Sequence, residues 1–416
     1  MGPALLERDQ ELSRLRSSLV EAVGGHGSAV LLFGEAGVGK TSVVRAFARE
    51  VAGTVRVLTG TCDDLITPRT FGPLRDAVRG GPLADALARG DRDAVLGEVE
   101  QELARSTTVL LVEDVHWADD ATLDVLRFLA RRIADLSALL VLTYRDDELG
   151  RGHPLHRVLA ALSGERVRRL RLRPLSRAAV ARLAGGTTAT SAPLHALTAG
   201  NPFFVTEALA AGTDGVPATV VDAVLARVHT LDRPVQVALE QLAVVPSRVE
   251  LPLARALLGD VTVLADAEHI GVLEVRPDAI AFRHELARRA VEGTLPRSVQ
   301  IELNARVLAA LRDREGTDLA RIVHHAVAAG DDAAVVAYAP EAARRACAVG
   351  AQNQGAMLYR AALARRELLA PEDEAALSEE DAWAEFHANH RRHALAAGER
   401  AVELRERLGD GSALGR

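Results

Sequence analysis

The sequence contains one lysine, Lys40, in 416 residues. All the other side chains counted with it as Lys or Arg are arginines. It has two cysteines, Cys62 and Cys347, which are too few for a disulfide framework and lack metal-ligand spacing. No segment approaches the roughly 18 uninterrupted apolar residues of a membrane helix, and charged residues interrupt positions 7–11, where a signal peptide would be apolar. These absences predict a soluble protein of the reducing cytoplasm with no membrane partner.

Excess positive charge is also missing, since the formal net charge is -7 and the pI is near 6.0. Proteins that bind duplex DNA or RNA usually carry a concentrated basic face. The most basic run, residues 166–173, alternates with Val167, Leu170 and Leu172, which is typical of a strand with one solvated side. We therefore expect no direct binding of nucleic acid by this segment.

Apolar runs and helical periodicity divide the chain into several parts. Runs at 29–33, 55–58, 109–112 and 139–142 alternate with helix-like segments, which predicts a parallel sheet with helices on both faces over residues 1–174. Ser176 stands where it would cap a helix, and strand signals become rare after it. We expect a helical subdomain over residues 175–215, ending in a Gly- and Pro-containing joint at 212–217.

The second half of the sequence predicts two further modules. Residues 216–296 combine short helices with a hairpin at 271–275 and 279–282, which is typical of a winged-helix module. Residues 297–416 are rich in Ala, Leu and Arg and break near Gly330, Gly350 and Pro371. This pattern predicts α-helical, TPR-like repeats, which we expect to be incomplete, so that the chain is a fragment.

Lys40 belongs to a complete G-x-x-x-x-G-K-T motif, which lies between the first apolar run and a helical segment. Glycines in such a loop let successive backbone N–H groups point at phosphate oxygens, and a compact ammonium reaches the terminal phosphates better than a guanidinium does. A Thr hydroxyl after the lysine is a ligand for Mg²⁺, and the helix that follows directs its positive end at the anion. The sequence therefore predicts an ATP or ADP site with Mg²⁺, formed by Gly34, Glu35, Ala36, Gly37, Val38, Gly39, Lys40, Thr41 and Ser42.

Two acidic residues follow the run at 109–112, at the end of what we expect to be a neighbouring strand. Glu113 and Asp114 would be costly if buried without a partner, which favours a role in holding Mg²⁺ and preparing a water molecule. The sequence leaves open which of the two holds the ion. Asp119 is more simply a helix cap. Arg145, after the run at 139–142, either senses the terminal phosphate or forms a surface pair with Asp146, Asp147 or Glu148.

Taken together, the motifs resemble the STAND class of P-loop ATPases, in particular the large LuxR-type transcriptional regulators of actinobacteria. The resemblance spans nearly the whole chain. It rests on residues 5–9, 34–41, 111–119, 143–149, 200–204 and 282–286. It implies an α/β P-loop NTPase fold followed by a helical subdomain, a winged helix and helical repeats.

The resemblance also assigns roles to single residues. It implies that Arg8 and its neighbours border the adenine, that Pro202 packs near the base, that Arg145 is the first sensor, and that His284 contacts the β-phosphate of ADP. Two features depart from the family pattern. Position 113 is Glu where many P-loop ATPases have Asp, and the family's DNA-binding helix-turn-helix is lacking here.

The resemblance implies a switch that hydrolyses ATP slowly, with an unknown inducer, a small molecule or a protein, binding the helical repeats. DNA contact would then require a further domain or a partner, and nucleotide-dependent self-association stays open. An AAA-type remodelling ATPase and a nucleotide-binding scaffold without hydrolysis are the alternatives. His387, His390 and His393 recur at three-residue spacing and raise a metal site on one helical side. Because no carboxylate or cysteine stands in a known ligand spacing, we predict no metal site there.

Overall fold

A computed structural model describes residues 5–65, 68–78, 80–187, 191–210, 220–314 and 316–409. The joint expected at 212–217 lies outside the described residues. The chain forms two compact units, one made of Met1–Cys62, Glu100–His116 and Arg127–Val299, the other of Asp63–Val99, Trp117–Leu126 and Gln300–Arg416. Among the described residues, no helix is both long and apolar enough to cross a membrane.

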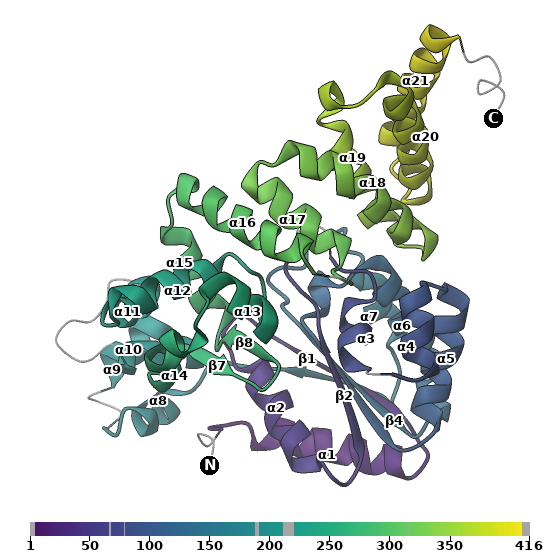
Figure 1. Cartoon of the computed structure of the whole chain (residues 1–416). Helices are drawn as coiled ribbons and strands as arrows, with labels where there is room; N and C mark the ends of the chain where they lie inside the picture. The colour runs from purple at the N-terminus through teal and green to yellow at the C-terminus, as the bar shows by residue number, and fades with distance from the viewer. Residues whose placement is uncertain are drawn as a thin grey trace. The chain divides into compact units, whose positions relative to one another are not determined.

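The first unit is built on a five-stranded parallel sheet with the order β2-β3-β4-β1-β5 (Figure 1). Its strands are β1 (Ser28–Phe33), β2 (Arg56–Thr61), β3 (Thr108–Glu113), β4 (Ala138–Tyr144) and β5 (Val167–Arg171). The predicted α/β core is therefore confirmed. The basic run forms β5, in which Leu170 is buried while Arg169 and Arg171 are exposed. One detail of the prediction is wrong: β3 is not next to β1, because β4 lies between them.

Both faces of the sheet are buried, as expected for parallel strands covered by helices. Helices α1 (Asp9–Val23) and α2 (Lys40–Val51) pack on one face, where Leu15, Val43 and Phe47 meet strand side chains such as Val30 and Val141. On the other face Leu31, Leu110 and Leu142 are at most 2% exposed. Burying each such side chain contributes about 1.5–3 kcal/mol, so the core fixes the strands whose ends form the site. Helix α7 (Leu155–Ala161) and the short η2 (Ile133–Asp135) complete this part of the unit.

Three short helices follow the sheet: α8 (Arg177–Leu183), α9 (Ala192–Thr198) and α10 (Pro202–Ala210). Ser176 caps the first of them as predicted, since its hydroxyl accepts a hydrogen bond from Ala179 N. A small core of Leu175, Val180 and Val205 holds the helices together, and Leu6 from the beginning of the chain packs against it.

The rest of the first unit combines helices with a three-stranded antiparallel sheet of order β6-β8-β7. The hairpin β7 (Leu273–Val275) and β8 (Ala279–Phe282) forms where the sequence predicted it. The other elements are α11 (Val220–His229), α12 (Arg233–Ala243), β6 (Arg248–Glu250), α13 (Leu251–Leu258), η3 (Val261–Leu264), α14 (Ala265–His269) and α15 (Glu285–Thr294). Helices around a small hairpin sheet are the composition expected of a winged helix.

The second unit is helical. Its helices are α3 (Gly72–Ala77), α4 (Pro82–Arg89), most of α5 (Arg92–Ala104), the start of α6 (Asp120–Ala130), most of α16 (Arg297–Arg312), α17 (Leu319–Ala329), α18 (Asp332–Ala348), α19 (Gln352–Leu363), α20 (Pro371–His387) and α21 (Arg391–Leu408), with the short η4 (Arg366–Leu368). Of the short η1 (Val115–Trp117), only Trp117 belongs to this unit. Helices α17 to α21 pack each against the next (Figure 1). Gly330 ends α17 in a left-handed conformation and Pro371 begins α20, as the predicted breaks require.

Asp119 caps α6, as predicted. Its carboxylate accepts hydrogen bonds from Thr122 N at 3.0 Å and from Phe71 N at 3.2 Å. Burial raises its pKa to about 6. Asp119 therefore has a structural role inside the second unit.

Candidate nucleotide-binding site

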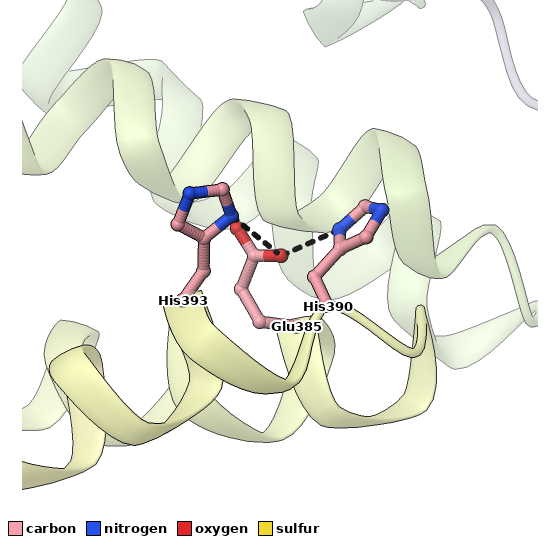
Figure 2. Close-up of side chains that lie close together, drawn as sticks. All are labelled: Glu385, His390 and His393. Carbon is pink, nitrogen blue, oxygen red and sulfur yellow. Dashed lines mark hydrogen bonds and ion pairs between the residues drawn. The ribbon is translucent and has the colours of Figure 1, made fainter.

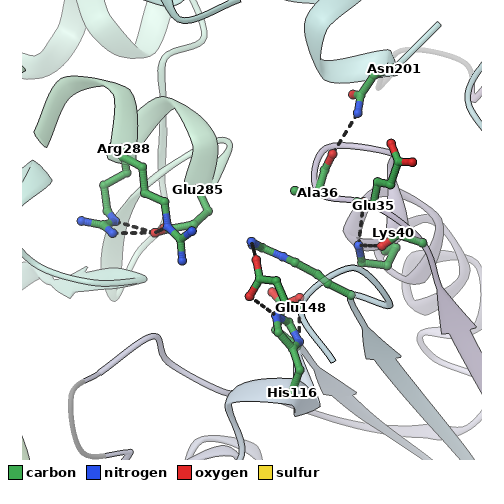
Figure 3. A network of polar contacts seen from close by, with 12 residues as sticks. Glu35, Ala36, Lys40, His116, Glu148, Asn201, Glu285 and Arg288 are labelled. Atoms are coloured by element: carbon green, nitrogen blue, oxygen red, sulfur yellow. Dashed lines mark hydrogen bonds and ion pairs between the residues drawn. The ribbon is translucent and has the colours of Figure 1, made fainter. Parts of the chain in front are cut away.

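The predicted phosphate-binding loop connects β1 to α2 and has the backbone that its glycines allow. Gly37 and Gly39 have φ values of 77° and 100°, which side chains rarely adopt. Lys40 begins α2, is 7% exposed, and donates through Nζ to Gly34 O at 2.6 Å and Glu35 O at 2.9 Å (Figure 3). Burial lowers the pKa of Lys40 to about 8. A buried ammonium whose hydrogen bonds, among the described residues, go to carbonyl oxygens would gain from an anionic partner.

The other loop residues differ in their burial. Gly34 and Val38 are buried, whereas Glu35 and Ser42 are exposed and Ala36, Gly39 and Thr41 are partly buried. The loop therefore combines residues packed into the protein with residues that solvent can reach. This is the arrangement in which backbone N–H groups can meet a phosphate.

The two acids at the end of β3 lie close to the loop. Glu113 is 5% exposed, and its carboxylate accepts a hydrogen bond from the Thr41 hydroxyl. Burial raises the pKa of Glu113 to about 7, against the opposing charge of Arg45. A buried carboxylate beside a threonine hydroxyl is a pair of oxygen ligands that fits Mg²⁺, and a cation there would compensate the buried charge.

Asp114 lies one residue further on and is oriented by its backbone. It has a φ of 55°, and its N–H donates to the hydroxyl of Thr143 on β4 at 2.9 Å. Burial raises the pKa of Asp114, while the positive charges of Arg145 and Lys40 oppose the rise. The Asp114 carboxylate therefore feels the charges of the loop lysine and of the strand-end arginine, and its Oδ1 lies 4.0 Å from His116 Nδ1.

Arg145 follows β4 and is 5% exposed. Its Nη1 donates to Glu148 Oε1 at 2.6 Å, and Glu148 Oε2 lies 3.4 Å from His116 Nε2 (Figure 3). Arg145 therefore pairs with Glu148, one of the three acids expected as surface partners. The pair is not a surface pair, because the arginine side chain is only 6% exposed. Burial, reinforced by the charge of Arg145, strongly lowers the pKa of His116, which is neutral at physiological pH.

The start of α10 contacts the loop directly. Asn201 Nδ2 donates to Ala36 O at 2.8 Å (Figure 3). Phe203 N donates to Gly37 O at 3.3 Å. Pro202 stands between them as the first residue of the helix. Arg8 meets the loop from another segment, since its Nη2 donates to Val38 O at 3.1 Å and to Arg173 O at 2.8 Å. The structure therefore brings Arg8 and Pro202 to the loop.

The hairpin module also reaches this region. The ring of His284, at the start of α15, lies 4.6 Å from the ring of Phe203, and burial lowers its pKa to about 4. On α2, Arg45 Nη1 forms an ion pair with Glu274 Oε2 of β7 at 2.7 Å. Three segments that are distant in sequence thus surround the loop and its helix.

Sequence reasoning missed three residues of this region. Asn201 lies in the segment 200–204, where the resemblance implied a role for Pro202 alone. A polar residue before a proline that begins a helix is nevertheless a cap signal. Arg45 and His116 gave no signal, because one arginine among many and one histidine after a strand are unremarkable without their partners. Their partners Glu274 and Glu148 come from other segments.

Two glycines of the loop provide a matched test of its packing against α10. A Cβ on Gly37 would lie 2.9 Å from Asn201 Oδ1 and from Phe203 Cβ, whereas one on Gly39 would meet nothing within 4 Å. Both substitutions place alanine at positive φ, which costs about 1–2 kcal/mol. We expect Gly37→Ala to lower the free energy of unfolding by about 1–3 kcal/mol more than Gly39→Ala. The reason is that only the methyl group at position 37 would be pressed against Asn201 and Phe203. Urea denaturation of the nucleotide-free protein measures the difference, and equal losses would show that α10 does not rest on the loop.

Comparison with known proteins agrees with this geometry. Residues 4–142 match the family of the AAA ATPase domain. This part of the chain, with its complete loop and parallel sheet, is a P-loop ATPase domain of AAA type. Such a domain implies nucleotide binding, typically with Mg²⁺.

The fold of nearly the whole chain is similar to that of a solved STAND protein. A Signal Transduction ATPase with Numerous Domains from Pyrococcus horikoshii, which has a tetratricopeptide repeat sensor, is similar over 97% of this chain with a TM-score of 0.55 and 15% identity. This chain covers 65% of that one. An uncharacterized protein of Rhizobium meliloti (strain 1021) is 27% identical over 79% of this chain, which spans 40% of the relative's length. The Aeropyrum pernix ORC2 protein is similar over 74% of this chain, with a TM-score of 0.37 and 14% identity, and this chain covers 96% of that one.

Proposed function

We propose that the chain is the switch portion of a LuxR-type transcriptional regulator. In this proposal ADP holds the ATPase domain (residues 1–174), the helical subdomain (175–215) and the winged-helix module (216–296) together, and ATP with an inducer releases them. The boundary at 215 lies outside the described residues. The observation that supports it best is that both later modules contact the loop or its helix, through Asn201 and through Glu274.

Each residue has a stated role in this proposal. Lys40 and the loop amides bind the phosphates, Thr41 and Glu113 hold Mg²⁺, and Asp114 orients the attacking water. Arg145 senses the terminal phosphate. When bound, Mg²⁺ supplies charge neutralisation at the phosphate oxygens. Arg8, Pro202 and His284 bind the rest of ADP, so that the nucleotide contacts all three modules.

The energetic requirement is differential binding, because a nucleotide with equal affinity for closed and open states shifts no population. Only the closed arrangement places Asn201 and His284 beside the loop, so ADP would prefer it. Turnover is slow in this proposal because the contacts around the loop must break before ADP leaves.

The remaining partners follow from the proposal. The inducer, a small molecule or a protein, binds the helical repeats of residues 297–416. DNA is recognised outside this chain, by a further domain or a partner, and the protein acts in the cytoplasm.

The Arg45–Glu274 ion pair allows a test of the closed state. We expect Glu274→Gln to speed the release of ADP about two- to fivefold, because a partly exposed pair stabilises the closed arrangement by about 0.2–1 kcal/mol. A fluorescent ADP analogue, displaced by excess ADP in stopped flow, measures the rate. The control is Glu50→Gln, since Glu50 pairs with Arg16 between α1 and α2, at 2.6 Å and with similar exposure. Equal release rates in wild type and both variants would contradict a switch closed through β7.

A further inference from the structure

The turn between α20 and α21 gathers two histidines and a buried carboxylate. Within the part of the chain that the structure describes, one group of possible metal ligands stands out: Glu385, His390 and His393, whose ligand atoms all lie within 4.8 Å of one another (Figure 2). The sequence had raised His387 instead of Glu385. His387 is the last residue of α20, and its ring lies against Trp383, with 6.1 Å between the ring centroids, so His387 is not part of this group.

We propose that Glu385, His390 and His393 bind a first-row divalent metal ion of the Zn²⁺ class and that the ion ties the end of α20 to the start of α21. One carboxylate and two imidazoles are a ligand set that suits zinc, whereas Mg²⁺ and Ca²⁺ prefer oxygen alone. The site is separate from the nucleotide site and does not depend on the proposed function.

The distances fit a metal of this size. Glu385 Oε2 lies 2.7 Å from His390 Nδ1 and 4.0 Å from His393 Nδ1 (Figure 2). Ligands about 2.0–2.1 Å from a tetrahedral ion are roughly 3.3–3.4 Å apart, a value between these two separations. Small movements of two exposed rings would therefore bring all three atoms to bonding distance.

The carboxylate is already oriented. Glu385 is fully buried, and its second oxygen, Oε1, forms an ion pair with Arg360 Nε of α19 at 3.1 Å. An outer partner of this kind fixes the direction of a ligating carboxylate. His390 is placed by the turn itself: Asn389 is left-handed with φ 66°, and His390 N donates to Glu385 O at 2.8 Å. The side chains of His390 and His393 are 42% and 64% exposed, which leaves room for water as a fourth ligand.

A neighbouring acid adds negative charge to the site. Asp381, one turn before Glu385 on α20, is 5% exposed, and among the described residues its Oδ1 has no hydrogen-bond partner. Burial, followed by the charge of Glu385, raises the pKa of Asp381 to about 7. Asp381 thus lies beside Glu385 with an unfilled acceptor, and a divalent cation at the site would favour the ionised form of both carboxylates.

The test is titration of the full chain with ZnCl₂ by calorimetry, after chelator treatment and with excess Mg²⁺ to occupy oxygen sites. We expect one Zn²⁺ per chain. His393→Ala should weaken binding at least about 100-fold, since losing even an outer partner of a ligand costs 10–100-fold. His390→Ala should do the same, and His387→Ala, a neighbouring histidine outside the group, should leave binding unchanged.

A second readout separates binding from folding. Co²⁺ in place of Zn²⁺ gives visible absorption bands that report its geometry, and these bands should disappear in His393→Ala while the far-ultraviolet circular dichroism stays that of wild type. Absence of stoichiometric Zn²⁺ binding in the wild type, or an equal loss in His387→Ala and His393→Ala, would overturn the proposal.

Discussion

Lys40→Met should weaken the binding of both ATP and ADP about 100-fold. The ammonium is the only lysine of the chain, it is buried, and a charge-assisted hydrogen bond of this kind contributes up to about 3 kcal/mol. Isothermal titration calorimetry of wild type and variant measures the effect. The nucleotide-free variant should unfold at no lower temperature than wild type, because burying the ammonium costs stability at neutral pH.

The lowered pKa gives this prediction a pH dependence. In the free protein Lys40 has a pKa of about 8, because it is buried. Bound phosphate requires the charged form and raises the pKa, so affinity is complete below pH 8 and falls above it. From pH 7 to pH 9 the affinity of the wild type should fall about tenfold. The affinity of Lys40→Met should show no such fall; a similar fall in both, or equal affinity of both at pH 7, would remove Lys40 from the phosphate site.

Glu113→Gln and Asp114→Asn should separate the two acids that the sequence could not distinguish. Glu113 shares a hydrogen bond with Thr41, so its loss should weaken Mg²⁺-dependent ATP binding roughly tenfold or more. Asp114 lies outside that pair, so Asp114→Asn should leave binding intact and lower phosphate release about 10²–10⁴-fold, the usual contribution of a group that prepares a nucleophile. Binding is measured by calorimetry with and without Mg²⁺, and turnover by phosphate release.

Asp146→Asn is the matched control for these two variants. Asp146 also follows a strand of the sheet, but its carboxylate pairs with Arg171 at 3.1 Å. We expect both binding and turnover to stay within about twofold of wild type, as for a surface pair. If Asp114→Asn left phosphate release unchanged, the chain would be a nucleotide-binding scaffold without hydrolysis. If the effects of Glu113→Gln and Asp114→Asn were exchanged, the assignment of ion and water would be reversed.

Much of the fold could be predicted because its signals are local. The run at 29–33, the loop after it and the periodic helix that follows are contiguous, and each depends on its own residues. Ser176 and Asp119 were predicted as caps for the same reason, since a cap bonds to a backbone group only three residues away. The hairpin around residues 276–278 is likewise a local feature.

The errors concern partners that are distant in sequence. The position of β4 between β1 and β3 depends on strand order, which no local pattern encodes. Arg145 has acids beside it in the sequence, and only packing shows that it is buried. The ligand group at residues 385–393 could not be predicted from the spacing of the histidines, because Asn389 turns the chain and Glu385 comes from the preceding helix.

The sequence by itself determined that a phosphate-binding loop stands between a buried strand and a helix, because glycine backbone freedom and a lone ammonium act over eight residues. Only the tertiary structure decided which groups surround that loop and which carboxylate meets Thr41. Asn201 and Glu113 reach the loop, and Glu274 reaches the helix after it, from three separate segments. Their approach is set by the burial of side chains throughout the unit.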